Sequence, residues 1–417
     1  MGANIIPVLL CASLVMFMQA GLALYGTGFA RAKNASHTMA MNLMAFALAI
    51  LAYWAAGFAV QSGDYRMFFL SGANGSAGVF ASFFFQAALM SVAVAIPAGA
   101  MAERWSFKSF SIYAVVMGAA VYPLFADWVW GGGWLSRLGF DFGLGHGFVD
   151  FAGSSVIHMT GGITALVGAR VLGPRTGKFG RNGSPSAFPG HHIPMAVAGT
   201  LILTFGWLGL TLGSALSGGD FRPGMVVVNT VLAGTAGAAA AMLYMWLRFG
   251  RPDLSLVLNG LLAGLVAISA PCAFVGTQAA VFIGAAAGAL ACWGVFFTER
   301  TLKVDDPVGA FAVHGLGGAW GALALGLFAN GGFGAGINGA AGPVAGLFYG
   351  APGQLLAQAI GILANLAYAG AAAFIMFKAL GLAVGNRVPP EMEDEGLDAS
   401  EVSVAAYPDF NLRKTSR

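Results

Sequence analysis

The 417-residue chain has very little charge: Asp, Glu, Lys and Arg make up 9% of it, against 58% hydrophobic residues and a mean hydropathy of +0.77. Soluble domains carry about 25% charged residues, so this composition excludes a soluble protein. We also expect no nucleic-acid partner. Cysteine is scarce too. Cys11, Cys272 and Cys292 lie in or beside apolar runs without metal-like spacing, which argues against a disulfide framework. Because no phosphate-binding loop or nucleophile motif occurs, we expect neither an enzyme nor a cofactor.

Apolar runs occupy most of the chain instead, and its 63 glycines suit close helix packing in lipid. Eleven runs are near the ~20 residues that a membrane-spanning helix needs. We therefore predict an all-α polytopic membrane protein with eleven transmembrane helices. The predicted spans are 5–30, 38–60, 79–102, 107–127, 149–172, 193–217, 223–247, 254–274, 276–298, 306–330 and 352–384.

Basic residues are distributed unevenly between the two sets of connections. Of the 20 Lys and Arg residues, only Arg66, Arg137 and Arg222 fall in one set; the others fall in the second set or in the C-terminal region. The positive-inside rule makes the second set cytoplasmic, with the N-terminus outside and the C-terminus inside. We predict a transmembrane domain over 1–386 in the cytoplasmic membrane and a cytoplasmic tail over 387–417. The plainer interpretation of this tail is a solvated segment without a function of its own.

Two stretches of the sequence share one layout. Counting from Asp150 and from Asp306, each has Gly at +3, His at +8 and a Gly pair at +11 and +12, which gives His158 and His314. If a helix starts at each Asp, a rise of ~1.5 Å per residue places each His ~12 Å further, near the middle of a ~30 Å hydrocarbon core. Ionisable groups at that depth are candidates for a functional site, although packing is the plainer role of a buried histidine.

The number of spans gives the relation between these stretches. Five crossings separate them, so spans one to five and six to ten form two inverted five-helix repeats, with one extra helix at the C-terminus. The pseudo-two-fold axis then lies in the membrane plane, and the two histidines approach each other at the centre. A central pathway lined by His158 and His314 is the function that this arrangement indicates.

Several motifs in this order are typical of one family, and the chain resembles ammonium transporters of the Amt/Rh type over essentially its whole length. The resemblance implies a homotrimer of eleven-helix protomers, each with its own narrow apolar pore. It also implies that a PII-type signalling protein docks on the tail and the cytoplasmic loops. The motifs are Ala102-Glu103-Arg104, Trp128-Val-Trp130-Gly-Gly-Gly, Asp150-Phe-Ala-Gly-Ser-Ser-Val-Ile-His158, Phe205-Gly-Trp207-Leu-Gly-Leu-Thr-Leu-Gly-Ser214, Asp305-Asp306-Pro-Val-Gly-Ala-Phe-Ala-Val-His314-Gly and Gly396-Leu397-Asp398.

The resemblance further implies an outer ammonium site formed by Trp130 and Ser214, with Asp150 stabilising the vestibule. A Trp face and a Ser hydroxyl can replace part of the hydration shell of a cation. Each residue has a plainer alternative. Trp130 could be an interfacial anchor, Ser214 could bond to its own helix, and Asp150 could cap a helix.

Below this site the resemblance implies a pore lined by Trp207, His158 and His314, in which the twin histidines share a ring hydrogen bond. Two positions depart from the family. Leu89 and Leu210 stand where the family usually has two stacked phenylalanines as a gate. Each lost ring could have attracted a cation by ~0.5–2 kcal/mol, so we expect weaker ammonium recruitment or a looser gate.

We predict that the protein transports ammonium or ammonia through this pore for nitrogen uptake. Neither histidine has a nearby third ligand in the sequence, so we expect no metal. The main alternative is an ammonium sensor of the same fold that conducts little. This alternative stands because Leu89 and Leu210 replace the usual aromatic gate. A second alternative is a channel for another neutral gas such as carbon dioxide, but Trp130 and Ser214 favour a cation.

Overall fold

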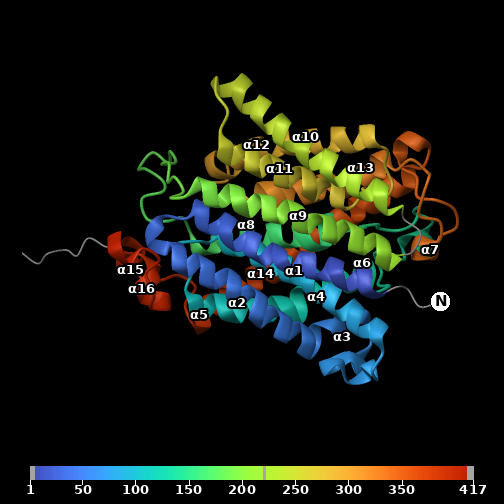
Figure 1. The fold of residues 1–417 in the computed structure, drawn as a ribbon, viewed down its shortest axis with the longest axis horizontal. Helices are drawn as coiled ribbons and strands as arrows, with labels where there is room; N and C mark the ends of the chain where they lie inside the picture. The colour runs from blue at the N-terminus through green and yellow to red at the C-terminus, as the bar shows by residue number, and fades with distance from the viewer. Residues whose placement is uncertain (1–4, 219–221, 411–417) are drawn as a thin grey trace, which may run out of the picture.

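The computed structural model describes residues 5–218 and 222–410, which form a bundle of long helices that run along its longest axis (Figure 1). In these residues there is no β-strand, only three isolated bridges. Ten of the described helices are long and apolar enough to cross a membrane, and Leu254–Ser269 is a shorter apolar helix. The helices of the bundle are α1 (Ile5–Phe29), α2 (Ala35–Ala52), α3 (Phe58–Ser62), α4 (Ala77–Ala100), α5 (Phe107–Val116), α6 (Tyr122–Trp130), α8 (Thr160–Leu172), α9 (Ile193–Gly218), α10 (Pro223–Phe249), α11 (Leu254–Ser269), α12 (Thr277–Arg300), α13 (Gly317–Phe328) and α14 (Pro352–Ala383).

Four π-helical segments interrupt or precede these helices. Tyr53–Gly57 joins α2 to α3, and Met117–Val121 joins α5 to α6, so each pair forms one span. Ser154–Met159 precedes α8 and Phe311–Leu316 precedes α13. Segments of this kind are rare in helices and often lie at functional sites. The last two contain His158 and His314.

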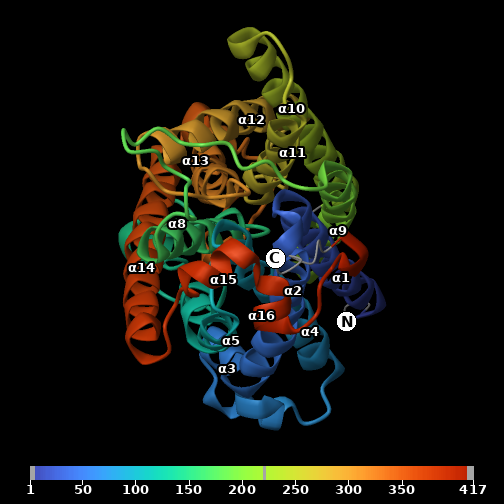
Figure 2. The ribbon, with the colours of Figure 1, turned by 90° about the vertical axis from the view of Figure 1, so that its left-hand side faces the viewer.

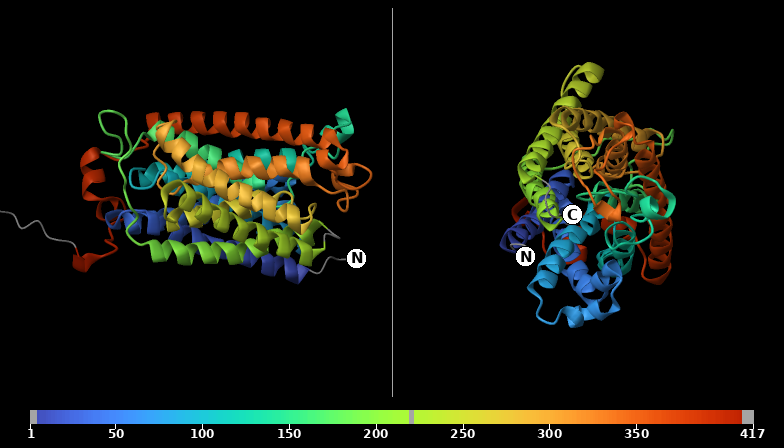
Figure 3. Two further views of the ribbon diagram at one scale, coloured as in Figure 1. Left: turned by 90° about the horizontal axis from the view of Figure 1, so that it is seen from above. Right: turned by 90° about the vertical axis from the view of Figure 1, so that its right-hand side faces the viewer.

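The bundle has two distinct ends. We call the end that carries the short helices α15 (Pro390–Glu395) and α16 (Leu397–Val402) the tail end, and the end with α7 (Leu138–Phe142) the far end (Figure 1). In Figure 2 α15 and α16 lie across the tail end. Helix α1 begins at the far end, while α14 runs along one edge of the bundle (Figure 3). The described chain therefore starts and finishes at opposite ends of the bundle.

Close packing of α1 against α9 depends on glycine. A Cβ atom added to Gly28 would lie 2.7 Å from the backbone nitrogen of Ala196, and one added to Gly199 would lie 2.5 Å from that of Tyr25. Neither distance is tolerable for a real side chain. Small residues that let two backbones approach in this way replace the hydrophobic effect as the basis of helix association in lipid.

The described part of the predicted tail packs on the tail end of the bundle instead of being freely solvated. The Asp398 carboxylate accepts a hydrogen bond from the backbone N–H of His37 at 2.9 Å, and Glu401 accepts one from the N–H of Phe107 at 2.6 Å. Both N–H groups lie in the first turns of α2 and α5, where a helix lacks its own acceptors and attracts negative charge. Residues 411–417 of the tail lie outside the described residues.

A buried ionic cluster lies beneath the tail. Arg175 bonds to Glu103 at 2.7 Å and to Asp305 at 2.9 Å, and Arg104 lies 3.9 Å from Asp305. Burial raises the pKa of the Asp305 carboxyl, but the positive charges of Arg104 and Arg175 outweigh it and hold this pKa well below its ordinary value. The Asp305 carboxylate is therefore part of a paired, ionised cluster at the tail end.

Candidate functional site

The two Asp-to-His stretches do not begin as helices, contrary to the sequence-based expectation. Gly153 and Gly309 have φ of 95° and 73°, a left-handed conformation that glycine adopts readily. The helical segments start after these turns, at Ser154 and close to Phe311. The expected rise of ~12 Å from Asp to His assumed a helix that starts at each Asp, and that assumption is wrong.

Asp150 caps the first of these segments. Its carboxylate accepts hydrogen bonds from the backbone N–H groups of Gly153, Ser155 and Val156 at 2.9, 2.7 and 2.8 Å. These groups are among the N–H donors that a helix start leaves unpaired. The carboxylate of Asp306 accepts one such bond, from Phe311 at 2.9 Å, and its Oδ1 atom is buried without a partner among the described residues.

His158 and His314 meet in the interior of the bundle. Their Nδ1 atoms lie 3.2 Å apart, and their rings are nearly parallel, with centroids 5.2 Å apart and planes at 22°. Because a neutral imidazole has one donor and one acceptor nitrogen, one Nδ1 donates and the other accepts. His158 is fully buried and its Nε2 atom has no partner in the described chain, whereas His314 is 7% exposed.

The glycine pairs after the histidines explain how the two segments come so close. A Cβ atom on Gly162 would lie 2.1 Å from the backbone nitrogen of Gly315, and one on Gly318 would lie 2.9 Å from that of Met159. The glycine four residues after each histidine thus contacts the residue directly after the other histidine. This reciprocal contact is the pattern that a two-fold axis between antiparallel segments produces.

Trp207 covers the free face of His158. The two rings are stacked, with centroids 4.7 Å apart and planes at 15°, and the indole N–H donates to the hydroxyl of Ser269 at 2.9 Å. Leu210 and Ser214 follow along α9, ~4.5 and ~10 Å further from Trp207 at ~1.5 Å per residue. Leu210 therefore lies between the histidine pair and Ser214, on the way to the far end.

Both predicted gate residues lie at one level of the bundle. The ring of Phe85 on α4 packs on Gly213 of α9, where an added Cβ would lie 2.4 Å from a ring carbon. Helices α4 and α9 run in opposite directions (Figure 1). Leu89 is one turn past Phe85 and Leu210 one turn before Gly213, so these two buried leucines come level with each other.

The two residues of the expected outer site are held separately. The indole N–H of Trp130 donates to the carbonyl oxygen of Asp150 at 2.7 Å, which fixes the ring beside the start of the first His segment. The hydroxyl of Ser214 donates to the carbonyl oxygen of Leu210 at 3.0 Å, the bond to its own helix that is the plainer alternative. Among the described residues no hydrogen bond joins Trp130 to Ser214. The hydroxyl oxygen of Ser214 remains free to accept.

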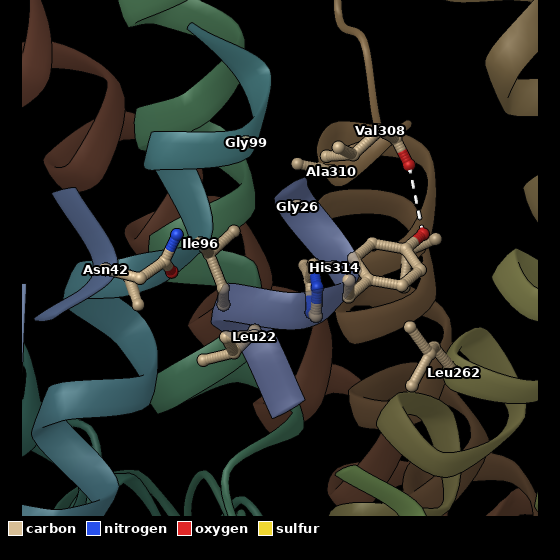
Figure 4. A pocket seen from close by; sticks show the side chains of 12 residues that line it. Leu22, Gly26, Asn42, Ile96, Gly99, Leu262, Val308, Ala310 and His314 are labelled. Atoms are coloured by element: carbon tan, nitrogen blue, oxygen red, sulfur yellow. Dashed lines mark hydrogen bonds between the residues drawn. The ribbon is translucent and has the colours of Figure 1, made fainter. Parts of the chain in front are cut away.

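On the tail-end side, His314 borders a cavity of about 20 Å³ that the sequence reasoning missed (Figure 4). Roughly 10–15 Å³ is enough for one water molecule. Tyr25 also lines the cavity, and its hydroxyl bonds to the side-chain oxygen of Asn259 and to the carbonyl oxygen of Val308, the latter at 3.2 Å. Asn259 and Val308 also line a larger cavity of about 630 Å³. The Tyr25 hydroxyl thus lies between a chamber at the histidines and a chamber at the tail end.

A sequence signal for this inner region existed. Tyr25, Asn42 and Asn259 are polar side chains inside otherwise apolar runs, and a buried polar group needs a partner. Which of them meet could not be read from spacing, because Tyr25 and Asn259 are 234 residues apart.

Apolar helices with glycine-lined contacts define a polytopic membrane protein, and its interior holds a histidine pair between a tryptophan and a small cavity. The sequence matches the Ammonium Transporter Family over residues 6–407. The chain belongs to this family.

Individual relatives agree with this assignment. The chain is 44% identical to ammonium transporter Amt2 of Archaeoglobus fulgidus, over 98% of this chain and 88% of that protein. It is 36% identical to ammonium transporter Amt1 of Haloferax mediterranei, over 98% of this chain and 80% of that protein. Among solved structures, one titled "Sensor Amt Protein" matches with a TM-score of 0.87 at 32% identity, covering 96% of this chain and 98% of that one. Mep2 of Candida albicans matches with a TM-score of 0.82 at 28% identity, covering 93% and 87%.

Proposed function

We propose that the protein moves ammonium or ammonia across the cytoplasmic membrane through a pore that passes the histidine pair. The observation that carries this proposal is the 3.2 Å approach of His158 and His314 inside an apolar bundle, between a stacked tryptophan and a cavity. Ionisable side chains at membrane depth are costly and usually mark a transport pathway. The tail end faces the cytoplasm in this proposal, in agreement with the basic residues there.

Recruitment takes place at the far end, where Trp130 and Ser214 replace part of the hydration shell. The N–H of Trp130 is occupied by the Asp150 carbonyl, so the ring offers only its face, which attracts cations. Asp150 acts here through the backbone, because its carboxylate is used to cap the helix start. The intact cation cannot proceed cheaply beyond this point, since the level of Leu89 and Leu210 is apolar.

Passage past the leucines requires either neutral ammonia or separate movement of the proton. A histidine ring suits both cases because its neutral form has a donor and an acceptor and its charge changes near neutral pH. His158 presents an unpaired Nε2 atom, while His314 borders the inner cavity. When Nδ1 of His158 carries the shared hydrogen, its Nε2 atom can accept a proton, the Nδ1 proton can move to Nδ1 of His314, and His314 then releases its own Nε2 proton.

The assembly and partner of the protein follow the family. We propose a homotrimer with one pore per protomer and a PII-type regulatory protein at the tail end. The lipid bilayer and the trimer contacts would cover the exposed apolar side chains of the bundle, which include Leu201, Leu247 and Leu363. The packed tail and its neighbouring basic loops would form the surface for the regulatory protein.

A gradient experiment tests the proposal. Purified protein in liposomes receives an inward ammonium gradient, while current and internal pH are recorded together. We expect a saturable flux from the wild type, a loss of at least tenfold in His158→Ala, and no change in His192→Gln, which alters an exposed histidine at the tail end. A rise in internal pH without current would indicate neutral ammonia, because ammonia that enters alone takes up a proton inside. Current without that rise would indicate that a proton crosses together with each ammonia.

The same assay separates the rival functions. A wild type that binds ammonium but carries no flux contradicts the transporter and supports a receptor of the same fold. Carbon dioxide flux without ammonium flux supports the gas channel. Restoring rings with Leu89→Phe and Leu210→Phe is expected to lower the ammonium concentration for half-maximal flux. An unchanged concentration would contradict the proposed role of the gate positions.

A further inference from the structure

Asp127 lies in the last turn of α6, one turn before Trp130, and its carboxylate rests over the glycine turn that follows the helix. A Cβ atom on Gly131 would lie 2.5 Å from Oδ1 of Asp127, and one on Gly133 would lie 3.1 Å from Oδ2. Gly63 faces the same carboxylate, with its added Cβ 3.7 Å from Oδ1. These glycines have no side chains that could cover the carboxylate group, which is partly buried.

The Asp127 carboxylate has no partner among the described residues: it forms no ion pair and accepts no hydrogen bond there. The other described acidic residues at the far end are all paired. Asp64 lies 2.8 Å from Arg66, Asp141 lies 3.1 Å from Arg137, and Asp150 accepts backbone bonds. Asp220 lies outside the described residues. Asp127 is therefore the unpaired negative charge in the described part of this end.

Its position is unfavourable for the protein itself. A negative charge in the last turn of a helix is repelled by the negative end of the helix dipole. Partial burial without a partner adds a desolvation cost. The carboxylate does not cap the turn either, because Gly131 and Gly133 donate to the backbone oxygen of Asp127. A stabilising role thus does not account for this side chain, and a cation that arrives from solution would remove both costs.

We propose that Asp127 attracts ammonium to the face of Trp130 and so sets the affinity of the outer site. Residues three apart on a helix are surface neighbours, with Cβ atoms ~5–6 Å apart, so the carboxylate acts on a cation at the ring. This inference rests on the proposed function, in which Trp130 recruits ammonium. The negative charge of Asp127 attracts the ammonium ion, which Leu89 and Leu210 cannot do because they lack the aromatic rings of the usual gate.

The test compares Asp127→Asn with Asp141→Asn, an outer carboxylate of equal charge that already has a partner. In liposomes at low salt, Asp127→Asn should raise the ammonium concentration for half-maximal flux about threefold or more. Its maximal rate should stay within a factor of two, and Asp141→Asn should match the wild type. The difference between the two variants should shrink at high salt, because ions screen charge. Equal behaviour of both variants overturns the proposal.

Two further measurements keep charge separate from folding and from transport. Asp127→Glu keeps the charge and should bind ammonium nearly as the wild type does; a loss equal to that of Asp127→Asn overturns the proposal. If the wild type carries no flux, ammonium binding is measured by calorimetry instead. Weaker binding by Asp127→Asn then supports this inference although transport has failed, and unchanged binding overturns it.

Discussion

The two halves around His158 and His314 share one backbone layout but differ in how their polar groups are satisfied. Asp150 accepts three backbone hydrogen bonds, while Asp306 accepts one and keeps a buried Oδ1 without a partner in the described residues. His158 is enclosed by Trp207, whereas His314 opens on a cavity. The two halves thus share a backbone conformation, while the residues packed around each half determine its hydrogen bonds and the exposure of its histidine.

The contrast has a local cause at the tail end. Asp305 directly precedes Asp306 and is bound by Arg104 and Arg175, while Val149 occupies the corresponding place before Asp150. One half therefore starts in an ionic cluster and the other in a capped turn. The two halves are therefore alike at the histidines and different at the residues that precede them.

The largest effect is expected for Asp305→Asn, which removes the ionic anchor that only one half possesses. The variant leaves the buried guanidinium groups of Arg175 and Arg104 without the negative charge of Asp305. This should lower the free energy of unfolding by about 3–5 kcal/mol at pH 7. The folded-state pKa of Asp305 lies well below its unfolded value of about 3.9. The stabilisation that the ionised Asp305 carboxylate provides is thus complete above about pH 4 and is lost as the pH falls toward the folded-state pKa.

Denaturation of the detergent-solubilised protein at pH 7 and below pH 4 checks this prediction. The gap between wild type and Asp305→Asn should narrow in acid. Asp141→Asn, which breaks an exposed pair, should change stability by less than about 1 kcal/mol and serves as the control. A gap that stays constant with pH would contradict the assigned charge state.

A smaller difference should separate Asp150→Ala from Asp306→Ala. The first change leaves three backbone N–H groups unpaired and should cost about 3 kcal/mol or more; the second leaves one unpaired and should cost about 1–2 kcal/mol. Thermal unfolding of both variants measures the difference. Equal losses would mean that the two carboxylates are equivalent and that the asymmetry described above is wrong.

The smallest difference between the two halves is expected at the glycines that follow the histidines. Gly162→Ala and Gly318→Ala each force a methyl group against backbone of the other half, at 2.1 and 2.2 Å in the present geometry, and should each cost about 1–3 kcal/mol. Gly317→Ala is the control, because its added Cβ would lie 3.4 Å from the nearest atom, the side chain of Val266. A loss confined to one of the two variants would disprove the reciprocal contact.

Much of the fold could be predicted from the sequence because apolar runs of spanning length leave few alternatives in lipid. The predicted span 79–102 corresponds to Ala77–Ala100 and 223–247 to Pro223–Phe249. Errors occurred where a local polar contact overrides hydropathy. Span 149–172 was predicted as helix from its start, but Gly153 turns the chain first. Span 254–274 was predicted too long: α11 ends at Ser269, and Asn229 binds the carbonyl oxygens of Cys272 and Val275 beyond it.

The candidate site could be predicted only for the residues that occur at equal positions in the two repeated stretches. Equal spacing from two Asp residues identified His158 and His314 as a pair, and the structure places them in contact. The contact of Tyr25 with Asn259 and the cluster of Asp305 with Arg175 join segments far apart in the chain. No spacing rule connects them, because they depend on which helices become neighbours. The roles of Trp130, Ser214, Leu89 and Leu210 remain proposals that flux measurements decide.

The central claim is that the two halves meet in one conducting unit at the histidines. Ammonium-driven flux in liposomes tests it most directly for His158→Ala, His314→Ala and the double variant. Groups that act as a unit show non-additive losses, so we predict that each single change lowers flux at least tenfold and that the double change lowers it no further. Losses that multiply in the double variant, or wild-type flux in either single variant, would contradict the account.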